Sequence, residues 1–352
     1  MKKLPFKRRK EAKQAIPSRI TNETVAEHRE RILAGGRRFK YPMQYARHKL
    51  VINTIIVTLV TLVLAAVVGW WQLYQVQNTS SFFYRVTRVL PLPVASVDGQ
   101  SVRYSSYLMY YNSSAHYLQS SEQVDLGSSD GKRQLDYVKR KSMDNVEQDA
   151  YAAKLASQLG ISVSEQQVDQ VITNDRNTAN GMISQETYDA SALSILGWSP
   201  DEYRQDAKSK LLHQAVAYAI DVTAKNKADQ TVGLVKAPNA DFGAIAAQLG
   251  GDGSAKVTAG VSGMVPLTNS DGGLSAEAAK LQKGAVSGVM KTTTGDGYYF
   301  VRLLDKGDTQ INYEYIRIPL TKFDEQFAAL KKDNKIHEYI SVPNVDNQSV
   351  TQ

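Results

Sequence analysis

Five histidines are the side chains best suited to acid–base chemistry or metal binding, and their spacing supports neither. They are His28, His48, His116, His213 and His337. No interval between them is typical of a metal site. The chain has no cysteine, which excludes disulfides, thiolate ligands and a cysteine nucleophile. We therefore predict neither a metal nor a cofactor.

Glycine-rich stretches also lack the patterns of known catalytic and nucleotide-binding loops. GVSGM, residues 260–264, is an incomplete nucleophile elbow. The chain contains no P-loop and no GxGxxG that opens a helix. GGDGS, residues 250–254, is typical of a turn, and the carboxylates are scattered. Hydrolase and nucleotide-binding classes are therefore disfavoured.

The stretch VSGVMKTTTGDGYYFVRLLDKG, residues 286–307, predicts a β-hairpin. β-Branched residues lead into a polar turn that contains glycine, and a strand of alternating bulk follows. Around it we expect short helices at 240–250 and 275–284, a strand with loops at 254–267, an alternating strand at 311–320 and a final helix at 321–340. These short segments are typical of an α+β module, predicted at 229–341 and followed by a tail at 342–352.

The preceding part, residues 94–228, is expected to be mostly helical. A short strand runs into an Asp98-Gly99 turn at its start. Helices are predicted at 101–118, 133–160, 164–176, 183–197 and 198–227. Gly160 is placed as a C-cap, Ser164 with Gln167 as a capping box, and Ser199-Pro200 as a helix start.

An uninterrupted apolar run, LVINTIIVTLVTLVLAAVVGWW, occupies residues 50–71. Its length fits the roughly 20 residues that cross a bilayer core. It is too long for the apolar part of a signal peptide, and no small-residue cleavage site follows it. We therefore predict a retained membrane anchor at 50–74, joined to the helical part by a connector at 75–93. Trp70, Trp71 and Tyr74 are expected at the membrane–water interface.

The net charge of +7 is unevenly distributed along the chain. The first 49 residues hold 15 Lys or Arg and 4 Asp or Glu, so the remainder is acidic overall. The positive-inside rule places this basic tail, residues 1–49, in the cytoplasm and the later domains outside the cell membrane. The tail is expected to be an unstructured topology signal, although contact with anionic lipid or nucleic acid stays open. For the chain as a whole we expect no nucleic-acid partner.

Three motifs in the helical part carry a resemblance to a family. VASVDGQSV (residues 94–102), LGISVSEQQVDQV (159–171) and LGWSPDEYRQDAKSKLL (196–212) occur in order at sensible spacing. Together they resemble the N-terminal domain of SurA-like and PrsA-like foldases. The resemblance implies a chaperone domain on the outer side of a membrane.

Residues 240–306 resemble the parvulin-type peptidyl-prolyl isomerase domain. In that family two histidines and an Asp or Cys lie beside a small apolar pocket that must favour the twisted amide over the planar one. On this alignment Tyr299 takes one histidine position, Val261 the Asp position and Ala279 a pocket Phe position. No methionine stands in the loop 268–273, where the family has one. Tyr299 is therefore interpreted as a packing residue in a module without catalysis.

The family's first strand, which carries the second histidine, is missing before Ala240. INYEYIRIPL, residues 311–320, resembles that strand and would place Tyr315 at the histidine position. This implies a circularly permuted module, since chain termini often lie close together. The alternative is an ordinary additional strand.

The sequence thus predicts a membrane-anchored chaperone or foldase that binds unfolded or nascent exported polypeptides. Candidate client-binding rings are Tyr104, Tyr107, Tyr111 and Trp198, whose helical spacing is equally typical of core packing. An active prolyl isomerase and a structural partner of an envelope complex are the alternatives. The oligomeric state is left open.

Overall fold

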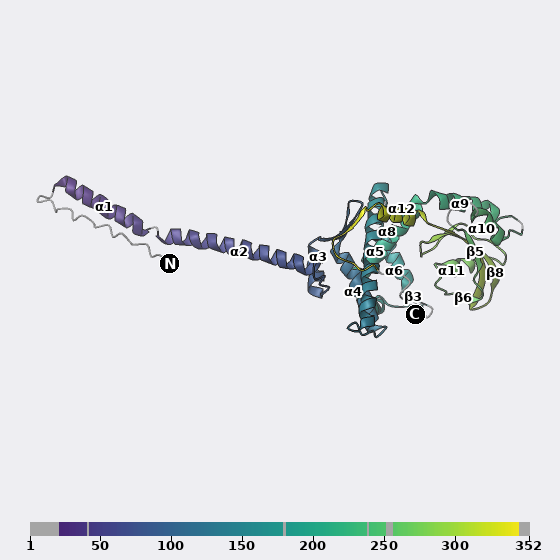
Figure 1. Ribbon diagram of the computed structural model, residues 1–352. Helices are drawn as coiled ribbons and strands as arrows, with labels where there is room; N and C mark the ends of the chain where they lie inside the picture. Colours follow the sequence, from purple (N-terminus) through teal and green to yellow (C-terminus); the bar gives the residue numbers. More distant parts are fainter. Residues whose placement is uncertain (1–20, 41, 179–180, 238, 251–255, 345–352) are drawn as a thin grey trace. The chain divides into compact units, whose positions relative to one another are not determined.

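The computed structural model describes residues 21–40, 42–178, 181–237, 239–250 and 256–344. The chain divides into two compact units, one ending at Gln72 and the other beginning at Leu73 (Figure 1). Each unit is described separately below.

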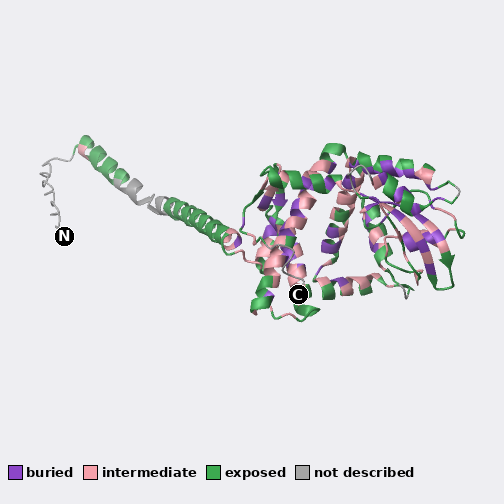
Figure 2. Ribbon diagram, turned by 45° about the vertical axis from the view of Figure 1, so that its right-hand side comes forward, coloured by how far each residue is buried: buried purple, intermediate pink, exposed green. Residues whose placement is uncertain are grey.

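The first unit is helical. α1 spans Asn22–Lys40, and α2, Pro42–Tyr74, continues from this unit into the start of the second. The expectation of an unstructured tail is therefore wrong for α1. Within the described residues, the part of α2 from His48 to Tyr74 is the one segment long and apolar enough to cross a membrane. Its apolar side chains are exposed along almost its whole length (Figure 2), which fits a single-pass anchor.

The second unit begins with a helical domain. Its elements are α3 (Ser81–Val89), β1 (Pro93–Val97), β2 (Gln100–Arg103), α4 (Tyr104–Ser120), α5 (Ser129–Leu159), α6 (Glu165–Asp175), β3 (Asn177–Thr178), β4 (Gly181–Met182), α7 (Gln185–Leu196) and α8 (Pro200–Ile220). The predicted helix ends are confirmed at Gly160, which is left-handed with φ 68°, and at the two capping boxes that begin at Ser164 and Ser199.

Three boundaries in this domain differ from the predictions. The helix expected from residue 101 begins at Tyr104, because residues 101–103 pair with β1 across the Asp98-Gly99 turn. The helix expected over 198–227 is broken at Asp221, which caps the next helix. The connector contains α3, whose short amphipathic sequence was not interpreted as a helix.

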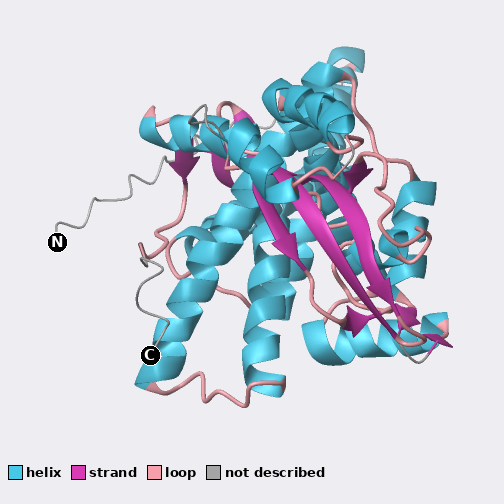
Figure 3. Ribbon diagram, turned by 90° about the vertical axis from the view of Figure 1, so that its right-hand side faces the viewer, coloured by secondary structure: helices cyan, strands magenta, loops and turns pink. Residues whose placement is uncertain are grey.

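An α/β module follows. Its elements are α9 (Val222–Leu234), α10 (Phe242–Gly250), β5 (Thr258–Val261), β6 (Val265–Pro266), α11 (Leu274–Ala278), β7 (Met290–Lys291), β8 (Gly297–Lys306) and β9 (Gln310–Pro319). The antiparallel sheet has the order β5-β9-β8-β7, and β6 also pairs with β9 (Figure 3). The predicted hairpin is confirmed as β7–β8.

The two faces of this sheet pack against different helices, because successive side chains of a strand point to opposite faces. Tyr298, Phe300, Ile316 and Ile318 pack with α9 and α10. The alternate residues pack with α11. β9 lies inside the sheet, between β5 and β8, and so is not a strand added at the edge.

The end of the chain returns to the helical domain. α12 spans Lys322–Lys332, and its Phe323 and Phe327 pack in the core of that domain. β10, Ile336–Glu338, pairs with β1, which gives a three-stranded sheet of order β10-β1-β2. The prediction of one helix over 321–340 within the α+β domain is therefore wrong after Lys332. Its last residues form a strand whose partner lies near the start of the domain.

Asp221 joins the two ends of the α/β module. This buried residue ends α8, and its Oδ1 accepts a hydrogen bond of 2.9 Å from the backbone N–H of Ala224. Its Oδ2 accepts bonds of 2.8 and 3.1 Å from the N–H groups of Thr321 and Lys322, where the chain leaves the sheet. The module is thus an insertion in the helical domain, with both of its ends bound to one carboxylate.

Candidate functional site

The face of the sheet that packs on α11 contains three tyrosines. Tyr299 comes from β8, and Tyr313 and Tyr315 come from β9. The register aligns Val301 with Tyr315, so Tyr299 and Tyr315 lie diagonally across the two central strands. Their ring centroids are 6.2 Å apart, and those of Tyr313 and Tyr315 are 6.4 Å apart. We name these three residues the tyrosine face.

Tyr299 is buried, and its hydroxyl is held by a carboxylate. The hydroxyl donates to Asp296 Oδ2 at 2.7 Å, and Arg317 Nε donates to the same oxygen at 2.8 Å. Thr292 and Thr294 donate to Asp296 Oδ1. Partial burial acts to raise the pKa of Asp296, but these hydrogen bonds and the Arg317 charge outweigh it and lower the pKa to about 2.

Tyr313 forms a second pair of the same kind. Its hydroxyl donates to Asp271 Oδ2 at 2.7 Å, and the backbone N–H of Ser275 donates to Asp271 at 3.1 Å. Burial raises the pKa of both Tyr299 and Tyr313, and the neighbouring carboxylate raises each further. Both phenols therefore remain neutral hydrogen-bond donors around neutral pH.

Tyr315 is half-buried between these pairs and lies against β5. A Cβ at Gly260, its partner residue on β5, would be 2.8 Å from the Tyr315 hydroxyl oxygen. The ring thus occupies the space that any larger residue at position 260 would need. This observation gives glycine at 260 a packing reason, which the sequence alone did not indicate.

The other positions aligned with the isomerase pocket are placed differently. Ala279 follows α11 and packs against the same cluster as the tyrosine face. Val261 does not join it: it pairs with Glu314, so its side chain is on the opposite side of the sheet, and it is 61% exposed. The alignment of Val261 with a pocket residue is therefore corrected by the strand register.

The tyrosine face has little capacity for acid–base chemistry at neutral pH. All five histidines are among the described residues, and none belongs to this cluster. His213 instead lies against Phe323 in the helical domain, where burial lowers its pKa. The two carboxylates next to the tyrosines already accept several hydrogen bonds each. No group of three or more His, Asp or Glu suited to a metal ion occurs within the described residues.

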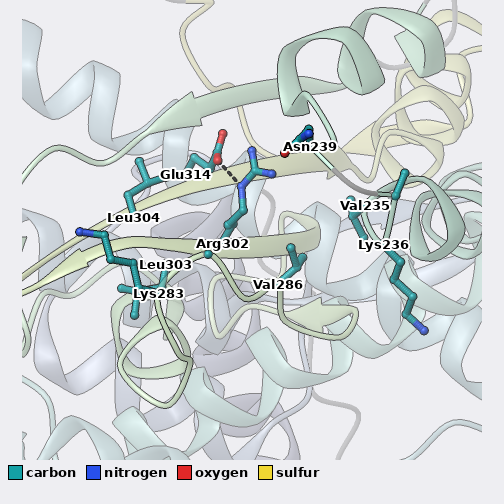
Figure 4. Close-up of a pocket in the computed structure, with 11 residues that line it drawn as sticks. Val235, Lys236, Asn239, Lys283, Val286, Arg302, Leu303, Leu304 and Glu314 are labelled. Atoms are coloured by element: carbon teal, nitrogen blue, oxygen red, sulfur yellow. Dashed lines mark hydrogen bonds and ion pairs between the residues drawn. The ribbon is translucent and has the colours of Figure 1, made fainter.

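A pocket of about 700 Å³ lies on the opposite face of the sheet (Figure 4). At its centre Arg302 of β8 forms an ion pair with Glu314 of β9. Arg302 also donates to the carbonyl of Ala240 at 2.7 Å, and its guanidinium lies 4.4 Å from the ring centroid of Phe242. These contacts engage Arg302 in holding α10 on the sheet. The sequence analysis did not identify this pocket, because it depends on the pairing of β8 with β9.

The four candidate client-binding rings are buried. Tyr104, Tyr107, Tyr111 and Trp198 are between 0% and 9% exposed. Tyr104 donates from its hydroxyl to the carbonyl of Leu73 at 2.6 Å, and the three tyrosines contact one another edge to face or by stacking. The simpler interpretation, core packing, is therefore correct, and the prediction of an open client-binding groove at these residues is corrected.

The three residues predicted at the membrane interface differ in their surroundings. Trp70 and Trp71 are each about half exposed. Tyr74 instead packs with its ring edge against Tyr104, and its hydroxyl donates to the carbonyl of Pro93 at 2.6 Å. Its hydroxyl is thus satisfied within the folded domain, which corrects its assignment to the lipid interface.

Comparison with known families supports the resemblance found for the helical domain. Residues 43–217 match the family model described as a SurA-like N-terminal domain. The match begins within α2 and ends near the end of α8. No curated protein matches the chain.

Proposed function

Because this chain carries the SurA-like N-terminal domain of a SurA/PrsA-like foldase, we propose that it is a membrane-anchored extracytoplasmic chaperone. It would bind unfolded or nascent exported polypeptides close to the membrane that they have crossed. The single observation that carries this proposal is the family match over residues 43–217.

The anchor and its direction are part of the proposal. The apolar segment His48–Tyr74 has the length of a single span. The excess of Lys and Arg before it supports a cytoplasmic N-terminus and an outer position for the helical domain and the α/β module.

Client contact is better assigned to exposed apolar side chains of the helical domain than to its buried tyrosines. Met182, Leu193 and Ile195 are 60%, 60% and 48% exposed. They belong to β4 and α7 within the residues that match the SurA-like family. Adaptable apolar side chains of this kind suit weak binding of many different clients.

The α/β module is proposed as a parvulin-like scaffold without isomerase activity. Two observations support a permuted arrangement: β9 lies inside the sheet, and its Tyr315 lies beside Tyr299 of β8. The absence of activity is inferred from the two positions aligned with histidines, which hold Tyr299, whose hydroxyl donates to Asp296, and Tyr315.

The test uses the full chain in lipid nanodiscs, with two assays. In the first, the protein is mixed with several unrelated unfolded clients and aggregation is followed by light scattering. We expect suppression for most clients. Leu193→Ser with Ile195→Ser should weaken it, whereas Val289→Ser, at a similarly exposed residue of the α/β module, should not.

The second assay measures prolyl isomerisation with a panel of X-Pro peptides, for the natural chain and for Tyr299→His. We expect no rate above the uncatalysed one for the natural chain. Clear catalysis would support the alternative of an active isomerase. Suppression limited to one client would favour a structural partner of an envelope complex, and no suppression at all would contradict the chaperone proposal.

A further inference from the structure

α3 lies on the same core as the end of the proposed anchor helix. Leu73 and Tyr74, the last residues of α2, pack in the main hydrophobic cluster of the second unit. Phe83 and Tyr84 of α3 pack against the same cluster. α3 therefore packs on the same core as the last two residues of α2.

The outer side of α3 is apolar where a soluble domain would normally be polar. Thr87 is buried and Phe83 is half-buried on the inner side. On the outer side Phe82 is 67% exposed, Val89 81% and Leu90, just after the helix, 51%. Three large apolar side chains so strongly exposed on one short helix and the residue after it indicate a surface that contacts something other than water.

Two arginines accompany these apolar residues. Arg85 and Arg88 are both exposed. Arg88 reaches Asp201 only at 3.9 Å, an exposed ion pair that contributes little to folding. Phenylalanine and aliphatic side chains next to arginines are typical of helices that lie in a membrane interface, where the cations meet lipid phosphates.

We propose that the outer side of α3, formed by Phe82, Arg85, Arg88, Val89 and Leu90, lies in the headgroup region of the membrane that α2 crosses. This inference rests on the proposed anchor. The membrane is favoured over a polypeptide client because α3 follows the apolar span closely in sequence, and Leu73 and Tyr74, the last residues of α2, pack in the same core as α3. The domain would then be attached to the bilayer at two places, through the span and through α3.

Because the chain has no cysteine, the test can use single-cysteine variants of the full protein. Phe82→Cys and Val89→Cys are labelled with an environment-sensitive fluorophore and reconstituted in vesicles of phosphatidylcholine and phosphatidylglycerol that contain a lipid with a nitroxide near its headgroup. Val261→Cys, 61% exposed in the α/β module, is the control. Val60→Cys, within the span, reports insertion.

We expect the nitroxide lipid to quench labels at 82 and 89 at least about twofold more strongly than the label at 261. Replacing Arg85 and Arg88 by Gln should weaken quenching at 82 in vesicles with phosphatidylglycerol and have little effect in phosphatidylcholine alone.

Quenching at 82 and 89 no stronger than at 261, with strong quenching at 60, would overturn the inference and leave the anchor intact. If the label at position 60 is not quenched either, the proposed anchor itself is overturned. Protection of 82 and 89 from both the lipid and an aqueous iodide quencher would show a protein contact instead, which also overturns it.

Discussion

Glu147 of α5 is fully buried, and neither of its carboxylate oxygens has a hydrogen-bond partner among the described residues. Arg140 Nη2 lies 3.7 Å from Oε2, with Asp144, Lys331 and Glu338 also around the site. Burial, followed by the Glu338 charge, raises the pKa of Glu147 to about 8. Because this carboxyl binds its proton more tightly in the folded chain than in the unfolded one, the folded protein becomes less stable as the pH rises. The loss develops between the pKa of the unfolded chain, roughly 4, and the folded pKa of about 8.

Glu147→Gln is therefore expected to flatten the dependence of stability on pH. At about pH 8 the variant should be more stable than the natural chain by roughly 1–3 kcal/mol, whereas near pH 5 the difference should be small. Arg140 keeps its bonds to Glu338 and Asp144 in the variant. Urea unfolding at both pH values measures the effect, with exposed Glu122→Gln as control. Equal shifts at the two pH values would show that Glu147 does not titrate as described.

For single residues, the sequence predicted that a side chain packs but not which groups it contacts. Tyr299 was interpreted as a packing residue, and it is buried. Its bond to Asp296 was not foreseeable, because Asp296 is three residues away across a turn whose geometry only the folded hairpin fixes. The burial of Glu147 was not predicted, because residue type alone does not distinguish a buried glutamate from an exposed one on a helix.

Among the elements, β10 is held in place by a distant part of the chain. It pairs with β1, the backbone N–H of Tyr339 donates to the carbonyl of Val94 at 2.9 Å, and Ile340 is 5% exposed. Ile340→Ala should lower the free energy of unfolding by about 2–4 kcal/mol, because it leaves a cavity in the core. Tyr339→Ala, at a neighbouring side chain that is 47% exposed, should cost less than about 1 kcal/mol. Comparable losses for both variants in thermal unfolding would contradict the assignment of Ile340 to the core.

Elements with local signals were predicted closely, and those without them were not. Gly160 and the capping boxes at Ser164 and Ser199 specify helix ends through residues that are neighbours in sequence. β10 has only three residues, and its identity as a strand comes from pairing with β1. A single sequence carries no such pairing information, so a continuing helix was the natural expectation there.

For the whole molecule, the charge asymmetry around α2 leads to a test of topology. We expect Thr21→Cys to face the cytoplasm and Glu122→Cys to face the outside, because Lys and Arg are concentrated before the span. A membrane-impermeant maleimide applied to intact cells should label position 122 and reach position 21 only after permeabilisation. The reverse pattern would invert the proposed orientation, and labelling of both positions would exclude a single span.

The sequence placed a helical part before an α+β part but did not reveal that one is inserted in the other. The spacing of apolar residues could have suggested the insertion. Phe323 and Phe327 recur at helical spacing after β9, although β9 already completes the sheet of the module. Which core those two rings enter is decided by tertiary packing.

The insertion held at Asp221 also has a consequence for the order of events in biosynthesis. β1 leaves the ribosome before the inserted module, whereas its partner β10 and the core residue Ile340 follow the module. Domains generally fold as units during synthesis, with N-terminal ones first. Here the inserted module can fold while the domain that surrounds it still waits for its final strand. A chain that stalls between the module and β10 would thus present a finished module on a domain that lacks one strand of its sheet.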